Sequence, residues 1–336
     1  MEYQPLGRTG VKVSRLCLGC MMFGGKTGEQ DSFAVIDRAI DAGINFLDTA
    51  NVYSRGRSEE VTGAALKRNG KRQRIVLATK VHGKMADDDP NMEGNSRRHI
   101  IQQCEASLRR LQTDYIDLYQ IHRPDSTIPI DETLRALDDL IRDGKVRYIG
   151  TSTYAAWQVV EALGVSKELG LNRFICEQPP YNLLDRRIER ELLPMARTYG
   201  IATIPWSPLA GGLLTGKYNR NQPPPAESRF GDLENAPHLQ RRWQEQLFDV
   251  TEGLAPLAEA KGCSMSQLAL AWCMQQPGVT SPIIGPRTMD QLEDNLGALE
   301  VTIDDNDRTT IDELVPPGTM VSPFYEADFG PHTHRI

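Results

Sequence analysis

Short apolar runs alternate with amphipathic segments along almost the whole chain. The first apolar run, residues 15–19, is followed from Asp31 by apolar residues at helical spacing, and this helix is expected to end at Gly43. The pattern predicts strands at 15–19, 44–47, 75–80, 115–121, 146–150, 174–177, 201–205 and 280–284. It predicts further helices at 58–67, 96–111, 131–142, 154–167, 186–198 and 289–298.

Regular alternation of strands and helices with right-handed crossovers closes into an α/β barrel. We therefore expect residues 1–336 to form a single (β/α)8 TIM-barrel domain. Residues 1–14 are expected to form a hairpin that plugs the barrel floor. Residues 211–276 are a long insertion after the seventh strand, and such insertions are usually either functional or disordered. Its first half should overhang the carboxyl-terminal rim, and helical periodicity begins near Arg241.

The C-terminal tail, residues 315–336, is rich in Pro and Gly and carries Phe324, Tyr325 and Phe329. These aromatic side chains either line a substrate pocket or pack back on the barrel, and the sequence leaves both readings open. We expect the loops at the rim and this tail to determine substrate specificity.

Composition excludes several classes of function. A net charge of -7 argues against a nucleic-acid surface, because phosphate contacts require a clustered excess of Lys and Arg. No stretch approaches the ~18 apolar residues of a membrane span. Residues 1–5 show no secretory signal, so a cytoplasmic protein without a membrane partner is expected. A homo-oligomer remains possible.

Four chemically active side chains lie at the ends of predicted strands. Asp48 ends the second strand, Lys80 ends the third and His122 follows the fourth, while Tyr53 lies in the loop after Asp48. Strands of a barrel end at one rim, where barrel enzymes keep their active sites. The four side chains are therefore expected to converge.

This combination suits proton donation to a carbonyl oxygen. Tyrosine has an ordinary pKa near 10, and a neighbouring cation such as Lys80 lowers that pKa by stabilising the phenolate. Asp48 would hold Lys80 as its buried partner, because an unpaired interior charge is costly. His122 would hydrogen-bond the substrate carbonyl or assist the proton transfer.

In this order, the four residues resemble the catalytic tetrad of the aldo-keto reductases. Further segments similar to family motifs are Leu6-Gly-Arg-Thr-Gly10, Leu18-Gly19, Asp48-Thr49-Ala50, Ile121-His-Arg-Pro-Asp125 and Trp206-Ser-Pro-Leu-Ala-Gly211. The resemblance covers nearly the whole chain and points to the long-loop branch that also includes potassium-channel beta subunits. It implies a barrel that reduces a small-molecule aldehyde or ketone to the alcohol, with hydride from NADPH and a proton from Tyr53.

A dinucleotide would have to be held without the usual glycine-rich motifs, because neither a Rossmann turn nor a P-loop is present. In barrels, phosphates bind at the loops after strands seven and eight and at a helix N-terminus. Trp206 can stack on the nicotinamide, and the small residues after it can approach the pyrophosphate. After strand eight, Thr288 can cap a helix, and Arg287 is placed to grip an adenosine 2′-phosphate.

The resemblance supplies the remaining cofactor contacts. It implies Ser152 and Gln178 at the carboxamide, Lys217 and Arg229 on the covering loop, and Gln291, Asp294 and Asn295 at the adenine end. The full expected set comprises Gly19, Met21, Met22, Asp48, Ser152, Gln178, Trp206, Ser207, Leu209, Gly211, Lys217, Arg229, Gly285, Arg287, Gln291, Asp294 and Asn295. One departure is Thr153, which stands where the family commonly has Asn and would replace that carboxamide contact only weakly.

Three alternative readings accompany the main one. The chain could be a cofactor-binding regulatory subunit with slow reductase chemistry. It could also be an isomerase or aldolase that uses Lys80 as a Schiff base. Cys17 and Cys20 could hold a metal, but two cysteines without further ligands do not complete a tetrahedral zinc site, so no metal is expected.

Overall fold

The computed structural model describes residues 1–233 and 235–325. Its centre is a sheet of eight parallel strands in the order β10-β3-β4-β5-β6-β7-β8-β9. The strands are β3 (Cys17–Gly19), β4 (Phe46–Asp48), β5 (Val76–Val81), β6 (Ile116–Ile121), β7 (Val146–Ser152), β8 (Cys176–Gln178), β9 (Ala202–Thr203) and β10 (Ile283–Ile284). Backbone bonds from Thr280 N to Thr203 O (2.7 Å) and from Ile283 N to Pro205 O (2.8 Å) join the two ends. The sheet therefore closes into a barrel.

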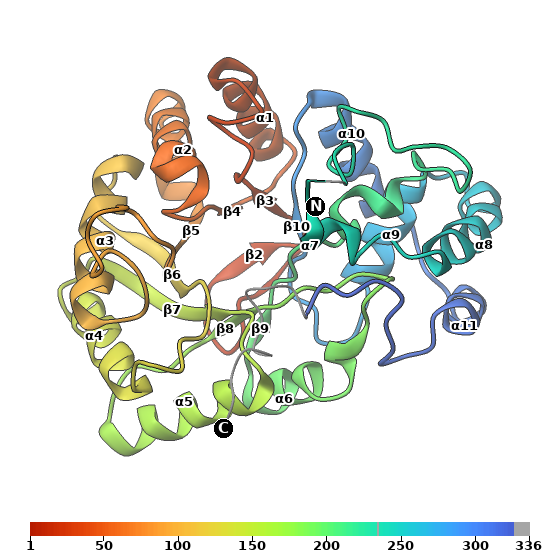
Figure 1. The fold of residues 1–336 in the computed structure, drawn as a ribbon. Coiled ribbons are helices and arrows are strands. Elements are labelled where there is room, and N and C mark those ends of the chain that lie inside the picture. The colour runs from red at the N-terminus through yellow and green to blue at the C-terminus, as the bar shows by residue number, and fades with distance from the viewer. Residues whose placement is uncertain (234, 326–336) are drawn as a thin grey trace.

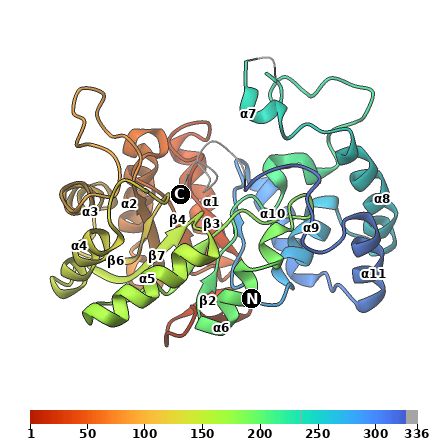
Figure 2. The same cartoon turned by 60° about the horizontal axis from the view of Figure 1, so that its bottom comes forward.

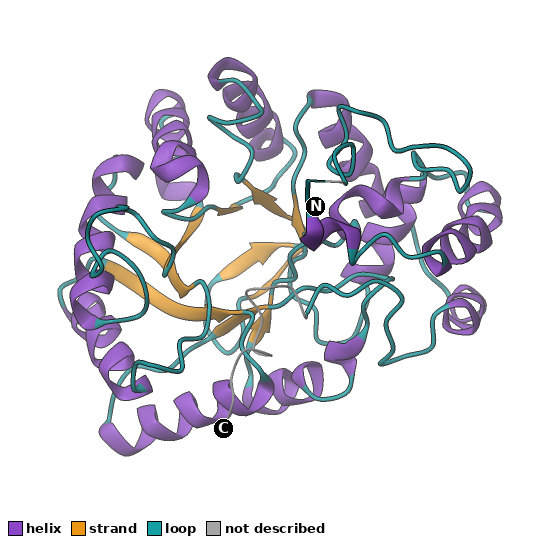
Figure 3. Cartoon of the chain, in the orientation of Figure 1, coloured by secondary structure: helices purple, strands orange, loops and turns teal. Residues whose placement is uncertain are grey.

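Helices surround the strands on the outside, as Figure 1 and Figure 3 show. Those that follow the first six barrel strands are α1 (Glu29–Asp41), α2 (Arg57–Asn69), α3 (Arg97–Leu111), α4 (Ile130–Arg142), α5 (Ala156–Leu169) and α6 (Leu192–Tyr199). Those in the second part of the chain are α7 (Pro237–Gln240), α8 (Gln246–Ala260), α9 (Met265–Met274), α10 (Met289–Gly297) and α11 (Asp305–Leu314). The predicted α/β barrel is confirmed.

An antiparallel hairpin precedes the barrel, as the sequence predicts. Its strands are β1 (Tyr3–Pro5) and β2 (Lys12–Ser14). Leu6 and Val13 are fully buried in a cluster with residues of the barrel interior. A Cβ on Gly7 would lie 2.7 Å from Ile175 O, just before β8, which places the hairpin at the end of the barrel where strands begin. It closes the floor, opposite the rim that carries Asp48.

The insertion after β9 has a small aromatic core of its own. Tyr218, Phe230 and Trp243 pack with ring centroids 5.3–5.7 Å apart, and Phe248 of α8 lies 5.5 Å from Trp243. This core fixes the first half of the insertion against α8. Figure 2 shows α7 standing out from the rest of the molecule.

Two helical segments differ from the prediction. The expected helix at 186–198 is divided into a 3₁₀ turn, Arg187–Glu189, and α6, which begins at Leu192. Pro194 suits the first turn of α6, where its missing N–H costs nothing, whereas inside a longer helix it would remove a backbone hydrogen bond and crowd the preceding turn. Helix α11 was not predicted. Its capping residue, Asp304, accepts from Asn306 N and Asp307 N, in a capping box that uses Asp at the third helical position rather than Glu or Gln.

Two further expectations concern the tail and membranes. Phe324 is fully buried, whereas Phe329 lies outside the described residues.

Among residues 1–233 and 235–325, none of the helices combines the length and the apolar character needed to span a bilayer.

Candidate active site

The rim where the barrel strands end brings the four expected side chains together. Asp48 is the last residue of β4, Lys80 lies in β5, and His122 follows β6. Lys80 Nζ donates to Asp48 Oδ2, to Thr49 O (2.8 Å) and to Tyr53 OH (3.5 Å). The rings of Tyr53 and His122 meet edge to face, with centroids 5.6 Å apart. The geometry therefore joins all four in one contiguous group.

A tight turn fixes Tyr53 over Lys80. Tyr53 opens a short turn, Tyr53–Gly56, in which Ser54 and Arg55 have φ of 47° and 52°. Such positive φ values are unfavourable for residues with side chains and persist only where the surroundings enforce them. Gly56 follows at φ 95° and a Cβ there would lie 2.7 Å from Arg110 Cδ, so glycine is required for the entry into α2. The turn directs the Tyr53 ring back toward the rim.

Burial and charge set the protonation of this group. Lys80 is fully buried and Asp48 is 2% exposed, while Tyr53 is half-buried. Burial alone lowers the pKa of Lys80, but Asp48 and Tyr53 beside it raise that pKa above its ordinary value. Burial, then Arg123 and Lys80, hold the pKa of His122 well below its usual range. At neutral pH, Lys80 is a cation and His122 is a neutral hydrogen-bonding group.

The second oxygen of Asp48 is held by two glutamines. Gln178 Nε2 donates to Asp48 Oδ1 at 2.8 Å and Gln120 Nε2 donates to the same oxygen at 3.2 Å. Gln178 was expected at the carboxamide, whereas Gln120 was missed. Its position in β6, two residues before His122, was the available signal, because side chains two apart in a strand share a face. Both amides stabilise the buried carboxylate.

The loop after β9 lies against a cluster of cations. Ser207 and Ala210 have φ of 55° and 51°, and Gly211 and Gly212 have φ of 66° and 104°. A Cβ on Gly212 would lie 3.1 Å from Lys217 Nζ, and one on Gly211 would lie 3.4 Å from Arg229 Cδ. The two glycines therefore keep the backbone open at the places where two cations approach it.

Arg287 adds a third positive charge to this cluster. Desolvation, and then the charge of Arg287, lower the pKa of both Lys217 and Arg229. Within residues 1–233 and 235–325, none of these three cations forms an ion pair with a carboxylate. Neighbouring cations repel one another, so the arrangement favours a bound polyanion. The residues fit the phosphates of a dinucleotide.

Helix α10 begins beside Arg287. Thr288 caps it as predicted, with its hydroxyl accepting from Gln291 N at 3.3 Å, and Gln291 Oε1 accepts from Arg287 N at 2.8 Å. Asp294 accepts from Ser264 Oγ at 2.7 Å, which ties α10 to the start of α9. Asn295 is buried. The expected adenine-end residues thus share one helix, and two of them also have structural partners.

The other expected cofactor residues surround the tetrad. Gly19 pairs with Asp48 across β3 and β4, and a Cβ on it would lie 2.7 Å from Ile283 Cγ2. Met21 is exposed and Met22 is half-buried on the loop after it. Ser152 ends β7 and donates to Gln178 O at 2.9 Å. The remaining members are Trp206, Ser207, Leu209 and Gly211 after β9, and the exposed Gly285 after β10.

Thr153 holds an arginine that sequence reasoning missed. Arg123 Nη1 donates to Thr153 Oγ1 at 2.9 Å and to His122 O at 2.6 Å. Desolvation lowers the pKa of Arg123 to about 10. Thr153 therefore links the ends of β6 and β7, and its hydroxyl is directed at Arg123.

Glu177 is a second missed group beside the site. It is fully buried at the middle of β8, where it accepts from the Thr151 hydroxyl and from Tyr154 N (3.1 Å). Burial raises the pKa of this carboxyl to about 8. The next residue, Gln178, was expected to contact the cofactor because of the family resemblance. The sequence does not indicate in which direction the Glu177 side chain points.

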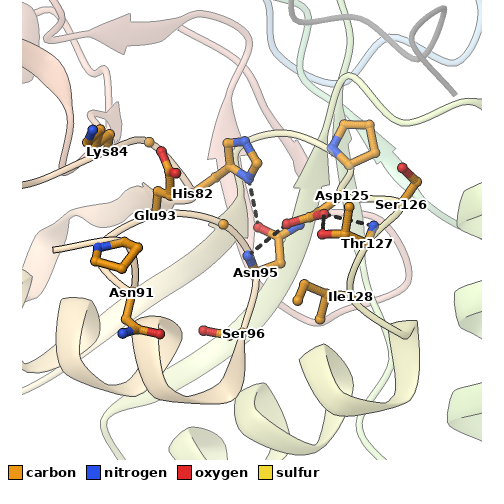
Figure 4. Close-up of a pocket in the computed structure, with 14 residues that line it drawn as sticks. His82, Lys84, Asn91, Glu93, Asn95, Ser96, Asp125, Ser126, Thr127 and Ile128 are labelled. Atoms are coloured by element: carbon orange, nitrogen blue, oxygen red, sulfur yellow. Dashed lines mark hydrogen bonds between the residues drawn. The ribbon is translucent and has the colours of Figure 1, made fainter. Parts of the chain in front are cut away.

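A polar pocket of about 530 Å³ lies between the loops that follow β5 and β6 (Figure 4). His82 Nδ1 and Asn95 Oδ1 share a hydrogen bond of 3.0 Å across it, and Asp125 Oδ2 accepts from Asn95 N at 3.3 Å. Its walls begin directly after the strands that carry Lys80 and His122. The described lining contains no tetrad residue.

The cysteines show no arrangement for metal binding. Cys17 and Cys20 are both free and buried, and burial raises the pKa of Cys20 to about 12. Across the described ranges, no three His, Cys, Asp or Glu side chains are placed to share a metal ion.

An α/β barrel with Asp, Tyr, Lys and His gathered at one rim is the architecture of a barrel enzyme. The sequence model of the aldo/keto reductase family matches residues 15–316, and the chain belongs to this family. Members of the family generally use NADH or NADPH.

Relatives of the chain carry two kinds of description. It is 41% identical over 327 residues to an uncharacterized oxidoreductase, YrpG, of Bacillus subtilis, a match that covers 95% of this chain and 97% of that protein. It is 42% identical over 308 residues to a probable voltage-gated potassium channel subunit beta of Oryza sativa, covering 90% and 92% of the two chains. A protein of the same description from Arabidopsis thaliana is 41% identical over 305 residues, with the same coverage.

Proposed function

We propose that this protein reduces an aldehyde or ketone to the corresponding alcohol with NADPH. The observation that carries the proposal is the placement of Lys80 Nζ between Asp48 and Tyr53 OH, at 3.5 Å from the phenol oxygen. Bound NADPH would supply the hydride from C4 of its nicotinamide ring. The residues of the chain provide the proton and the binding site.

Tyr53 is the proton donor in this proposal. A cation beside a phenol stabilises the phenolate that remains after proton transfer, and Lys80 keeps its charge because Asp48 lies against it. His122 stays neutral, so it can orient the carbonyl oxygen by a hydrogen bond without competing as the acid. The raised pKa of Lys80 also counts against a Schiff-base mechanism, which requires the neutral amine.

Lys217, Arg229 and Arg287 would hold the phosphates of the cofactor. Their mutual proximity and the adjoining backbone of Gly211 and Gly212 suit a chain of phosphate groups. Arg287 lies at the start of α10, where the helix dipole also favours an anion. Three cations are enough to bind the pyrophosphate and also the 2′-phosphate that NADPH carries and NADH lacks. We therefore propose NADPH rather than NADH. Trp206, Ser152 and Gln178 are assigned to the nicotinamide end.

A second candidate function follows from the relatives described as potassium channel beta subunits. In that case the barrel would bind NADPH and turn over slowly while it regulates a membrane channel. Both candidates need the same cofactor site, so binding alone does not separate them. The rate of turnover with a good substrate does.

The test is a screen of NADPH oxidation against aldehydes, ketones and keto-sugars, with NADPH binding measured separately by fluorescence. Reduction at rates above about 1 s⁻¹, within the ordinary range of enzymes, supports the reductase. Tight NADPH binding with turnover far below that rate for every compound supports the regulatory subunit. Failure to bind NADPH or NADH would contradict both.

A further inference from the structure

The last described residues, 319–325, pack along the chain segment that follows β8. Thr319 O accepts from Arg186 N (2.9 Å), and Leu184 O accepts from Val321 N (2.8 Å) and Ser322 N (3.0 Å). We call residues 319–325 the C-terminal strap. Ser322 Oγ also donates to Arg242 O at 2.8 Å, so the strap joins the barrel to the insertion after β9.

A buried carboxylate anchors the strap. Asp185 is 1% exposed, and its Oδ2 accepts from Phe324 N (2.7 Å) and Tyr325 N (3.0 Å). Arg187 donates to both carboxylate oxygens of Asp185, at 2.8 and 2.7 Å. A buried polar group is stabilised when its hydrogen-bonding sites are filled, so the strap backbone and Arg187 together stabilise the Asp185 side chain in the interior.

The anchored strap touches both walls of the proposed nicotinamide site. Phe324 is fully buried, and its ring centroid lies 6.3 Å from that of Trp206 at an angle of 62°. Tyr325 OH donates to Tyr154 O at 2.7 Å, two residues beyond Ser152. Trp206 and Ser152 stand on separate strand ends, and adjacent strap residues contact both regions.

We propose that the C-terminal strap is a positioning element for the nicotinamide half of the cofactor, with Asp185, Phe324 and Tyr325 as its positioning residues. Phe324 supports the ring of Trp206, and Tyr325 fixes the backbone after β7. The inference rests on the proposed function, because Trp206 and Ser152 are assigned to the nicotinamide there. It goes further by giving the strap a role in holding one half of the cofactor and not the other.

The experiment compares two ligands that share the 2′-phosphate end. NADPH carries the nicotinamide, and adenosine 2′,5′-bisphosphate lacks it. Phe324→Leu removes the edge contact to Trp206 and keeps an apolar side chain. Phe46→Leu is the matched control, because Phe46 is equally buried but lies in the cluster at the barrel floor. Dissociation constants are measured for both ligands by fluorescence or calorimetry.

Phe324→Leu should weaken NADPH binding about threefold to tenfold, the effect of one aromatic contact, and leave the bisphosphate unchanged. Phe46→Leu should change neither. In a Trp206→Leu background, Phe324→Leu should have no further effect on NADPH binding, because the side chain it supports is already gone. Equal weakening of both ligands, or unchanged NADPH binding, would overturn the proposal.

Tyr325→Phe gives a second, milder test should Phe324→Leu fail to fold. It deletes the hydroxyl that donates to Tyr154 O and should weaken NADPH binding about twofold to fivefold, with the bisphosphate unaffected. Unchanged NADPH binding in this variant overturns the role of the strap. If the unaltered protein binds the bisphosphate but shows no added affinity for NADPH, the nicotinamide assignment of the proposed function fails instead.

Discussion

Gln178 donates a hydrogen bond of 2.8 Å from its Nε2 to Oδ1 of Asp48. The same amide nitrogen lies 3.3 Å from Gln120 Oε1, so Gln178 Oε1 takes part in neither bond. Gln178, which is proposed to bind the carboxamide of the nicotinamide, therefore also holds the Asp48 carboxylate that keeps Lys80 in place. The proposed cofactor site and the proton donor are therefore connected by one hydrogen-bonded network. Substitutions in this network should change NADPH affinity and turnover to different extents.

Gln120→Leu should lower turnover and weaken NADPH binding less than Gln178→Leu does, because Gln120 bonds directly to Asp48 and touches the proposed cofactor site only through its bond from Gln178. Loss of a hydrogen bond to a buried charge should also reduce the free energy of unfolding by about 1.5–3 kcal/mol. Gln178→Leu should impair both turnover and NADPH affinity. Steady-state kinetics, NADPH titration and urea denaturation measure the three quantities.

Gln103→Leu is the control for these two variants. Gln103 is also buried, but it accepts a hydrogen bond from Asn51 and has no contact with Asp48. It should lose stability without a comparable loss of turnover. Identical kinetics for Gln120→Leu and Gln103→Leu would show that Gln120 serves packing only.

Tyr53→Phe removes the proposed proton donor and keeps the ring against His122. Turnover should fall by at least about a hundredfold, since positioned acid catalysis contributes roughly 10²–10⁴-fold, and NADPH affinity should change little. Tyr119→Phe is the matched control, because its hydroxyl bonds to Ile100 O inside the barrel wall. Near-normal turnover in Tyr53→Phe would refute the assignment of the proton donor.

Lys80→Met should abolish most turnover and also destabilise the fold. It leaves Asp48 as a buried charge without its cation, which costs about 3–5 kcal/mol in the free energy of unfolding. Adding Asp48→Asn to Lys80→Met should recover part of that stability but none of the turnover. A double variant no more stable than Lys80→Met would contradict the unpaired Asp48 charge as the cause of the lost stability.

The strand-end residues could be predicted because the barrel imposes a simple rule. Once apolar runs and helices alternate, each strand must end at the same rim, and a polar residue at such an end is conspicuous. Asp48, Lys80 and His122 follow that rule. Thr288 was also predictable, because a threonine before a helical pattern is a recognisable cap.

The contacts that the sequence could not reveal depend on side-chain direction or on long-range packing. Glu177 sits next to Gln178, and only the fold shows that its carboxyl meets Thr151 and Tyr154. Asp185 binds backbone groups of Phe324 and Tyr325, which lie about 140 positions later in the chain. Periodicity carries no information on such pairs. The aromatic core of the insertion was missed for the same reason, since its members are spread over irregular chain.

Glu177→Gln should alter the pH dependence of stability. The pKa of Glu177 is raised from 4.5 to about 8, so between these values the folded protein binds a proton that the unfolded chain does not. Its contribution to stability is complete below about pH 4.5 and is lost as pH rises to 8, by up to about 1.4 kcal/mol per pH unit. The neutral amide of the variant would have no such dependence.

The difference in unfolding free energy between Glu177→Gln and the unaltered protein should therefore shift in favour of the variant as pH rises from about 5 to about 8. Urea denaturation at several pH values measures it. Subtraction removes the contribution of other titrating groups. A difference that stays constant over this range would show that Glu177 is ionised in the folded protein throughout.

Arg287→Ala tests the choice between cofactors. A charge-assisted contact to the 2′-phosphate contributes roughly 1.5–3 kcal/mol, which corresponds to about a tenfold to hundredfold change in affinity. NADPH binding should weaken by that factor and lose part of its salt dependence, while NADH binding should stay nearly unchanged because NADH lacks the phosphate. Arg38→Ala is the control, since Arg38 pairs with Glu293 of helix α10 and its charge is already balanced. Fluorescence titration with both cofactors measures the result, and equal losses for NADPH and NADH would mean that Arg287 supports the loop without contacting the phosphate.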